Sequence, residues 1–173
     1  QDHKRIFDGD KGPNTGGMGT YAPAPVLTDA LRDEAMKTIL EPMVAAMQKE
    51  GMPYVGCLYA GLMITPQGPK VVEFNARFGD PETQVVLPLL DSDLGQIMMA
   101  CATGTLTADM VKWKDSSAAC VILASKGYPE TSSKGDVIHG DIKQHDTTIV
   151  FHSGTKLVGD EYVTNGGRVL GVV

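Results

Sequence analysis

The sequence predicts an α+β fold with a small β domain at its C-terminal end. In the first part of the chain, apolar residues at helical spacing surround two strand-like runs that a Pro-Gly turn separates. After about residue 115, short apolar segments alternate with glycine turns, which is typical of a small and mostly antiparallel β domain. We therefore expect two domains, at residues 1–108 and 109–173.

The first expected elements are a long loop and a helix. Five glycines lie among polar residues in 7–25, which is the composition of a loop, and unstructured loops of that length are usually functional or disordered. Thr28 is a suitable N-cap for a helix that begins at Asp29, because apolar residues then recur at helical spacing. Pro42 should kink or split this helix before it ends at Gly51.

A β-hairpin and two helices are expected next. Val55–Thr65 and Lys70–Arg77 are rich in residues that favour strands and flank a Pro-Gly turn, so they should pair as a hairpin. The segments from Pro81 to about Leu90 and from Leu94 to about Thr103 have helical character. A strongly apolar strand over Ser117–Ser125 begins the predicted β domain.

Composition and charge argue against several classes of function. With 42% hydrophobic residues the chain is able to bury one good core or two small ones, and a net charge of −6 argues against nucleic acid as a partner. The sequence contains no run of about 18 apolar residues, so it predicts no membrane-spanning helix. The three cysteines are widely spaced and odd in number, so we interpret them as reduced core residues of a cytoplasmic protein.

The motif Glu73-Phe74-Asn75-Ala76-Arg77 lies at the end of the second hairpin strand. Alternate residues of a strand share a face, so Glu73, Asn75 and Arg77 should project together. The residues between them, with Val72, should face the core. A carboxylate and an amide oxygen side by side suit Mg²⁺, and a guanidinium offers two donors to a phosphate or carboxylate. The alternative is an exposed polar face with a Glu73–Arg77 ion pair.

Asp80 follows directly in the run Phe78-Gly79-Asp80-Pro81-Glu82. Gly79 leaves the backbone free to turn, and Pro81 suits the first position of a helix. Asp80 then either caps that helix with its side chain, or contacts a substrate amine or a metal-bound water. The residues by themselves leave both interpretations open.

Gly12–Gly19 holds four glycines in eight residues, and we call it the glycine loop. Such a loop allows backbone N–H groups to converge on an anion, in the arrangement called a nest. A flexible loop without a binding site is the alternative. No Gly-Lys-Ser/Thr follows, so the loop is not a P-loop, and Gly19 stands where an EF-hand needs its bidentate glutamate.

Together these segments resemble the phosphoribosylamine–glycine ligases, or glycinamide ribonucleotide synthetases, of the ATP-grasp superfamily. The likeness covers essentially the whole chain. The run Arg-Phe-Gly-Asp-Pro-Glu is highly specific to this family, whereas the pattern Glu-x-Asn-x-Arg is shared across the superfamily. The segments that carry the resemblance are Gln1–Arg5, Gly12–Pro25, Glu73–Gln84, Ala124–Pro129 and Gly166–Val172.

The resemblance implies an ATP-grasp core, which is an antiparallel sheet flanked by helices, followed by a small antiparallel β domain. Residues 1–108 would be the second half of the ATP-grasp catalytic domain and 109–173 a truncated C-terminal domain. The N-terminal domain and most of the lid over adenine would be absent. The chain also begins without Met and stops within an apolar run. We therefore interpret it as a fragment that packs on those missing parts and is inactive alone.

The reaction that the resemblance implies uses ATP to join glycine to 5-phosphoribosylamine, giving glycinamide ribonucleotide in purine biosynthesis. Glycine would take the γ-phosphoryl group, and the amine would then displace phosphate from glycyl phosphate. Glu73 and Asn75 would hold Mg²⁺ or Mn²⁺, and Arg77 would stabilise the migrating phosphoryl group or the glycine carboxylate. The loop backbone would cradle the acyl-phosphate oxyanion. The implied catalytic residues are Arg77, Asn14 and Gly17, and the implied substrate- or phosphate-binding residues are Asn14, Thr15, Gly16, Gly17, Met18, Gly19, Asp80 and Lys126.

The sequence departs from many ATP-grasp relatives at one place. Those relatives have a further metal-binding carboxylate on the strand before the Glu-x-Asn strand. Val55–Thr65 contains no Asp or Glu, and Leu62, near the expected place, is unable to bind a metal. The ligands of any second ion must therefore come from elsewhere.

Two other functions remain open. Another ATP-grasp ligase, such as a biotin-carboxylase-like or carboxyaminoimidazole-type enzyme, would share the Glu-x-Asn-x-Arg pattern, but the run Gly79-Asp80-Pro81-Glu82 argues against it. A fragment that only binds a nucleotide or a partner is the non-enzymatic alternative, because little of the expected lid is present to hold adenine.

Overall fold

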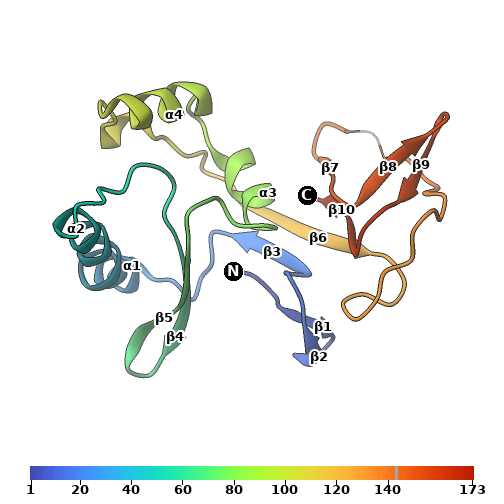
Figure 1. The fold of residues 1–173 in the computed structure, drawn as a ribbon, viewed down its shortest axis with the longest axis horizontal. Coiled ribbons are helices and arrows are strands. Elements are labelled where there is room, and N and C mark those ends of the chain that lie inside the picture. The colour runs from blue at the N-terminus through green and yellow to red at the C-terminus, as the bar shows by residue number, and fades with distance from the viewer. Residues whose placement is uncertain (143) are drawn as a thin grey trace. The chain divides into compact units, whose positions relative to one another are not determined.

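The computed structural model of the chain describes residues 1–142 and 144–173 (Figure 1). These residues form two compact units. The sheet unit comprises Gln1–Pro23, Asp80–Leu89 and Asp115–Val173, and the hairpin unit comprises Ala24–Gly79 and Leu90–Lys114. Each unit is assembled from segments that are distant in the sequence. The expected domains 1–108 and 109–173 come from a single cut of the chain, and that division stays a prediction.

A four-stranded antiparallel sheet lies at the centre of the sheet unit, in the order β3–β6–β10–β7. β6 is the apolar strand that the sequence predicts near Ser117–Ser125. It pairs with β3 on one side, where Thr20 lies opposite Cys120, and with β10 on the other, where Gly171 lies opposite Ile122. The four strands are β3 (Gly19–Ala22), β6 (Ala118–Ala124), β10 (Arg168–Val172) and β7 (Val150–His152).

The core of the sheet unit lies between this sheet and a short helix. α3 (Thr83–Val86) packs against β3 and β6, and its Val85, only 1% exposed, meets Cys120 and Ile122. Burial, with a smaller effect from the Asp80 charge, raises the pKa of the Cys120 thiol to about 11. A buried and protonated thiol behaves as a small apolar side chain, as expected from the sequence.

The helix predicted from Pro81 to about Leu90 is much shorter in the structure. Only Thr83–Val86 is α-helical, and Leu87–Leu89 continues as a 3₁₀ turn, η2. Pro88 has no amide hydrogen for an α-helical hydrogen bond, and its ring collides with the carbonyl four residues earlier. The tighter turn avoids both problems over a few residues.

Two smaller hairpins complete the sheet unit. β1 (Arg5–Phe7) pairs with β2 (Lys11–Asn14), and β8 (Thr155–Val158) pairs with β9 (Glu161–Thr164), both in antiparallel fashion. Gly9 and Asp10 make the β1–β2 turn with φ angles of 69° and 58°, values that suit glycine and that aspartate tolerates. The strand pairs confirm the predicted α+β class with antiparallel sheets.

The hairpin unit begins with the predicted long helix, in three parts. α1 (Asp29–Ala35) continues into a π-helical turn, η1 (Met36–Leu40), and then into α2 (Glu41–Lys49). Thr28 is the N-cap as predicted, and its hydroxyl accepts a hydrogen bond from the Leu31 amide at 3.3 Å. Pro42 stands in the first turn of α2, so the wider π turn before it accommodates the missing donor without breaking the helix.

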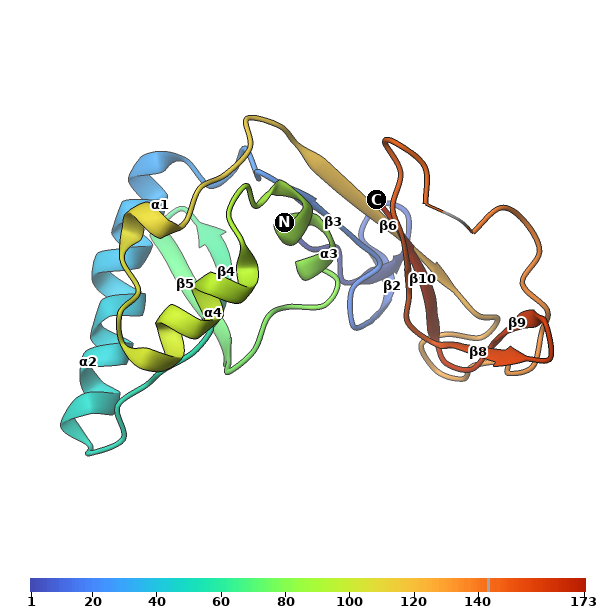
Figure 2. The same cartoon turned by 90° about the horizontal axis from the view of Figure 1, so that it is seen from above.

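The predicted β-hairpin is confirmed beside this helix, but its first strand begins at Tyr59 and not at Val55. β4 (Tyr59–Thr65) pairs antiparallel with β5 (Gly68–Asn75), and α1 packs against β5 (Figure 2). α4 (Leu94–Thr103) also occupies the expected residues and is followed by a 3₁₀ turn, η3 (Ala108–Met110). Asp93 caps the N-terminus of α4, and Gly104 ends it with a left-handed φ of 71°.

In the described part of the chain, no helix has both the length and the apolar character needed to cross a membrane. The cysteines Cys57, Cys101 and Cys120 are free thiols. The first two are half-buried in the hairpin unit, and the third lies in the core of the sheet unit.

Val85→Ala should lower the free energy of unfolding by about 1.5–3 kcal/mol, because it removes two buried methyl groups and leaves a cavity against β6. Val121→Ala is the matched control. Val121 lies between Cys120 and Ile122 but is 60% exposed, so its loss should change stability by about 0.5 kcal/mol or less. Urea unfolding followed by circular dichroism measures both, and equal effects would contradict this description of the core.

Candidate functional site

Glu73 and Asn75 lie at the end of β5, in the hairpin unit. Glu73 stands opposite Gly61 of β4, and Asn75 stands opposite Tyr59. A Cβ on Gly61 would lie 3.1 Å from the Glu73 Cγ, so the glutamate stem lies over the glycine and uses the space that it leaves. Residues two apart in a strand share a face, so the carboxylate and the amide are neighbours.

Both side chains have oxygen atoms to offer a ligand. Glu73 is exposed and Asn75 is half-buried, and across residues 1–142 and 144–173 neither side chain forms a hydrogen bond or ion pair. Two oxygen donors of this kind fit a hard cation that keeps most of its waters. No group of three or more His, Cys, Asp or Glu side chains able to hold a metal occurs in the same described ranges. A cation here would therefore take its other ligands from water and substrate.

Arg77 lies outside the strand in which the sequence predicts it. β5 ends at Asn75, the chain bends, and the Arg77 Nη1 donates to the Phe78 carbonyl oxygen at 3.0 Å. The expectation that Arg77 alternates with Glu73 and Asn75 along one strand is wrong, because strand alternation stops where the strand stops. Val72, expected to face the core, is 67% exposed. The cavity predicted to join these residues with the glycine loop involves both units, and it stays a prediction.

The glycine loop runs from β2 into the start of β3, so the segment 7–25 is not the continuous loop that its composition predicts. Between the two strands, four amides donate to internal acceptors. To bind an anion, these amides would first have to give up their present hydrogen bonds. The anion-binding nest therefore stays a prediction. The Asn14 side chain is exposed and has no hydrogen bond in the described part of the chain, so it is open to a ligand. The four bonds run from Thr15 to the Lys4 carbonyl (2.7 Å), from Gly16 to the Tyr128 hydroxyl (2.9 Å), from Gly17 to the Thr15 Oγ1 (2.9 Å) and from Met18 to the His3 carbonyl (2.8 Å).

Gly17 is the position where the loop requires glycine. Its φ of 118° lies in the region that residues with a Cβ rarely adopt. A Cβ there would collide with the Pro81 ring and lie 2.7 Å from the Asp2 Oδ1. Thr20, just after the loop, donates from its buried hydroxyl to the Pro81 carbonyl at 3.0 Å. The loop thus lies directly against the segment that contains Asp80.

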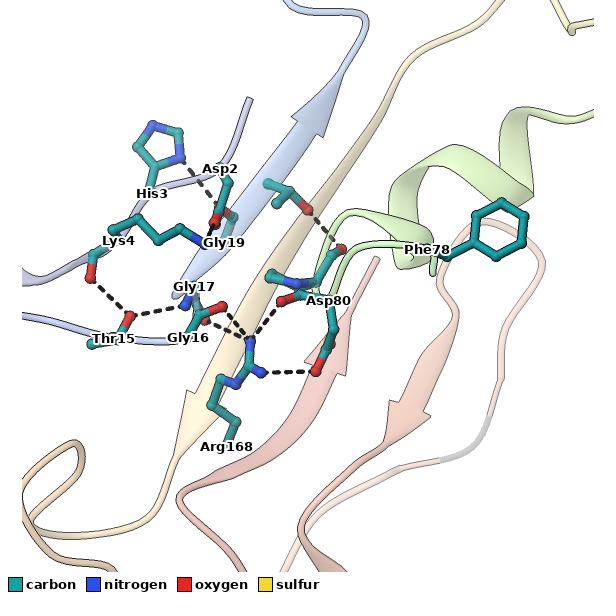
Figure 3. Close-up of polar contacts among 12 residues, drawn as sticks. Asp2, His3, Lys4, Thr15, Gly16, Gly17, Gly19, Phe78, Asp80 and Arg168 are labelled. Carbon is teal, nitrogen blue, oxygen red and sulfur yellow. Dashed lines mark hydrogen bonds and ion pairs between the residues drawn. The ribbon is translucent and has the colours of Figure 1, made fainter. Parts of the chain in front are cut away.

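Arg168, the first residue of β10, contacts both of these segments (Figure 3). Its Nη1 donates to the carbonyl oxygens of Gly16 at 2.8 Å, Asp80 at 3.0 Å and Gly17 at 3.4 Å. Its Nη2 forms an ion pair with the Asp80 Oδ2 at 2.8 Å. The sequence by itself predicts no role for Arg168, although this residue lies in the segment Gly166–Val172 that carries the family resemblance. The available signal was a single arginine between two glycines and an apolar run.

Asp80 uses both oxygens of its carboxylate within the sheet unit. Besides the Arg168 ion pair, its Oδ1 accepts a hydrogen bond from the Gln84 Nε2 at 2.7 Å. The N-cap of α3 is Glu82, so the interpretation of Asp80 as the helix cap is wrong. Asp80 instead accepts from a side chain one turn into the helix. Its contact with a substrate amine stays a prediction.

Asp2 is a nearly buried carboxylate beside the glycine loop. Its side chain is 9% exposed and forms an ion pair with the Lys4 Nζ at 2.5 Å. Its Oδ1, which faces Gly17, has no hydrogen-bond donor in the described ranges. Burial raises the pKa of the Asp2 carboxyl, and the opposing effect of Lys4 is smaller.

Lys126 is another predicted binding residue of the sheet unit. Lys126 is exposed and begins the turn that carries Tyr128, and its carbonyl accepts from the Ser133 amide at 3.1 Å. Its contact with a ribose phosphate stays a prediction.

A cavity of about 460 Å³ lies between the β1–β2 hairpin and the paired strands β3 and β6. Met18 and Gly19 are the predicted site residues that line it.

Comparison with family models gives two matches. Residues 1–83 match the model described as "Phosphoribosylglycinamide synthetase, ATP-grasp (A) domain", and residues 118–173 match "Phosphoribosylglycinamide synthetase, C domain". Together the matches span most of the chain. They include the glycine loop, Glu73, Asn75 and Asp80 in the first segment and Arg168 in the second.

Individual proteins resemble the chain over nearly its whole length. A phosphoribosylamine–glycine ligase of Caulobacter vibrioides is 55% identical over 99% of this chain, and a trifunctional purine biosynthetic protein of Gallus gallus is 54% identical over 99%. A crystal structure of phosphoribosylamine–glycine ligase from Thermotoga maritima superposes on 99% of the chain with a TM-score of 0.82 and 33% identity. The chain spans 41%, 17% and 42% of the lengths of these three proteins, respectively.

Asp2→Asn should change the pH dependence of stability. A carboxyl whose pKa is raised in the folded state contributes stability below its ordinary pKa of 3.8, and that contribution is lost as the pH rises through the folded pKa. The free energy of unfolding of the parent chain, relative to the variant, should therefore fall as the pH rises from about 4. Urea unfolding at a series of pH values measures this difference.

Asp109→Asn is the matched control for this prediction. A hydrogen bond from the Thr107 side chain lowers the pKa of the exposed Asp109 carboxyl. Its contribution is therefore present above the ordinary pKa and lost as the pH falls, the opposite sign. The free energy of unfolding of the parent minus that of Asp2→Asn should fall with pH. If this difference stays constant or rises with pH, it would contradict the burial of Asp2.

Proposed function

Because the chain belongs to the phosphoribosylglycinamide synthetase family, we propose that the protein containing it joins glycine to 5-phosphoribosylamine with the use of ATP. The products are glycinamide ribonucleotide, ADP and phosphate, within purine biosynthesis. The observation that carries this proposal is the pair Glu73 and Asn75, whose neighbouring side-chain oxygens have no other partner in the described part of the chain. The sequence also contains the glycine-loop motif and the Asp80–Pro81 motif of the family.

The proposed reaction has two balanced steps. An oxygen of the glycine carboxylate attacks the γ-phosphorus of ATP, which releases ADP and forms glycyl phosphate. The amine of 5-phosphoribosylamine then attacks the acyl carbon, loses a proton and expels phosphate. Phosphoryl transfer depends mainly on positioning and on neutralisation of charge, so the protein needs no nucleophilic side chain.

Glu73 and Asn75 would hold Mg²⁺ or Mn²⁺ in this proposal. The bound ion supplies positive charge to the phosphate oxygens. Arg77 is exposed immediately after the strand and would stabilise the migrating phosphoryl group or the glycine carboxylate. Because β4 lies within Val55–Thr65, which contains no Asp or Glu, the ligands of any second ion would come from another segment.

The glycine loop would contribute mainly through Asn14 and through its shape. The internal hydrogen bonds of the Thr15–Met18 amides give the loop a defined conformation. The Asn14 side chain is able to meet a substrate without any of those bonds being broken. The catalytic role of Gly17, and the substrate contacts of Asp80 and Lys126, are parts of the same proposal. So is a cytoplasmic location, which the free thiols favour.

The activity is proposed for a longer polypeptide. The matched ligases and purine biosynthetic proteins extend well beyond the region that this chain covers. The 173-residue chain should therefore release ADP at a negligible rate with glycine and phosphoribosylamine, while the longer polypeptide should turn over many times. Measuring ADP for both, with each substrate omitted in turn, separates the proposed ligase from another ATP-grasp ligase and from a fragment that only binds nucleotide. Robust turnover by the 173-residue chain would contradict the fragment interpretation.

Glu73→Gln in the longer polypeptide should raise the Mg²⁺ concentration needed for half-maximal activity by roughly 10–100-fold, because it removes a charged ligand. Glu50→Gln is the matched control. It removes the same charge from the exposed end of α2 and should leave the Mg²⁺ titration unchanged. Superimposable titrations for Glu73→Gln and the parent would count against Glu73 as a ligand.

A further inference from the structure

We propose that Arg168 is a positioning residue, which holds the glycine loop and Asp80 in the conformation that the ligase reaction needs. This inference rests on the proposed function. It adds a residue from the last strand of the chain to the glycine loop and Asp80, proposed site residues that lie in the sheet unit. All of the groups involved lie in the sheet unit.

The contacts of Arg168 join three segments that are far apart in the sequence. Gly16 and Asp80 are 152 and 88 residues away from it in the sequence, and the carbonyl oxygens of both accept hydrogen bonds from its Nη1 atom. The side chain is only 20% exposed and has a carboxylate on its Nη2. A largely buried cation is stable only where acceptors surround it, and here the acceptors are backbone and Asp80 atoms.

The bonds to Gly16 and Gly17 determine the orientation of the loop's peptide groups. Glycine has no side chain that would restrict φ and ψ, so an outside contact must select one conformation. A peptide is planar and trans, so fixing the Gly16 carbonyl also fixes the Gly17 N–H on the opposite side. That N–H donates to the Thr15 Oγ1, and the Gly16 N–H donates to the Tyr128 hydroxyl. Arg168 therefore restrains the backbone that follows Asn14.

The fit between the guanidinium and the loop is close. A Cβ on Gly16 would lie 2.8 Å from the Arg168 Cζ, so the glycine backbone rests directly against the guanidinium. The planar group donates to carbonyl and carboxylate oxygens in different directions at once, which the single ammonium of lysine is unable to reproduce. Because three backbone carbonyls and the Asp80 carboxylate accept hydrogen bonds from Nη1 and Nη2, the role assigned to Arg168 is to hold the loop and Asp80.

The test uses Arg168→Ala and Arg168→Lys in the longer polypeptide, with ADP release as the assay. Both variants should lose about 10–100-fold in kcat/KM for glycine or phosphoribosylamine, as expected when reacting groups are misplaced by about 1 Å. The Mg²⁺ titration should stay at the parent value, because Glu73 and Asn75 are untouched. Millimolar guanidinium chloride should restore part of the activity of Arg168→Ala, and sodium chloride at the same concentration should not.

Arg32→Ala and Arg32→Lys are the matched controls. Arg32 is exposed on α1 and pairs only locally, with Asp29 and Asp33, so its variants should keep the parent kinetics. Unchanged kcat/KM in the Arg168 variants would overturn the inference. So would a loss of activity in Arg168→Ala that guanidinium fails to relieve, since a general folding defect has that result.

Amide hydrogen exchange gives a readout that does not depend on turnover. Exchange at Gly16 and Gly17 should become faster in Arg168→Ala, while the amides of β6 keep their protection. Unchanged exchange in the loop would overturn the positioning role. If the parent itself shows no ligase turnover, the proposed function fails, and the exchange data still decide whether Arg168 orders the loop.

Discussion

The ion pair and hydrogen bonds of Arg168 hold together the glycine loop and the Asp80 segment of the candidate site. One guanidinium contacts the backbone at Gly16 and Gly17 and both the backbone and the carboxylate of Asp80. The loop is rich in glycine and has little conformational preference of its own. Its defined shape therefore comes from contacts made by other segments, and the largely buried guanidinium of Arg168 supplies charge-assisted hydrogen bonds among them.

The antiparallel sheet makes that contact possible. β6 pairs with β3 on one side and with β10 on the other, so the residues after the glycine loop and the residues from Arg168 onward are two strands apart. α3 covers the same sheet through Val85, and the Thr20 hydroxyl bonds to the Pro81 carbonyl just before it. The position of Asp80 is thus determined by the packing of the core as well as by its ion pair.

Sequence patterns predicted the elements whose stability is local. The Thr28 cap and α4 with its terminal glycine occur at the expected residues, because capping and periodicity signals act over a few neighbours. The β4–β5 hairpin also forms around the expected turn, although its strands have other ends than predicted. The same reasoning failed at the helix after Pro81, where a 3₁₀ turn follows only one turn of α-helix, and at Arg77, which lies past the end of its strand. In both places the outcome depends on where a regular element ends, and local propensity determines element ends poorly.

By itself, the sequence determined the α+β class, the family motifs and the position of Glu73 and Asn75 on one face of the same strand. These features depend on spacing along a short stretch of chain. Only the tertiary structure decided which polar groups are already used. The amides of Gly16 and Met18, the carboxylate of Asp80 and the guanidinium of Arg168 find their partners through folding. A hydrogen bond between residues as far apart as 152 positions leaves no periodic signal, because it depends on the three-dimensional path of everything between them.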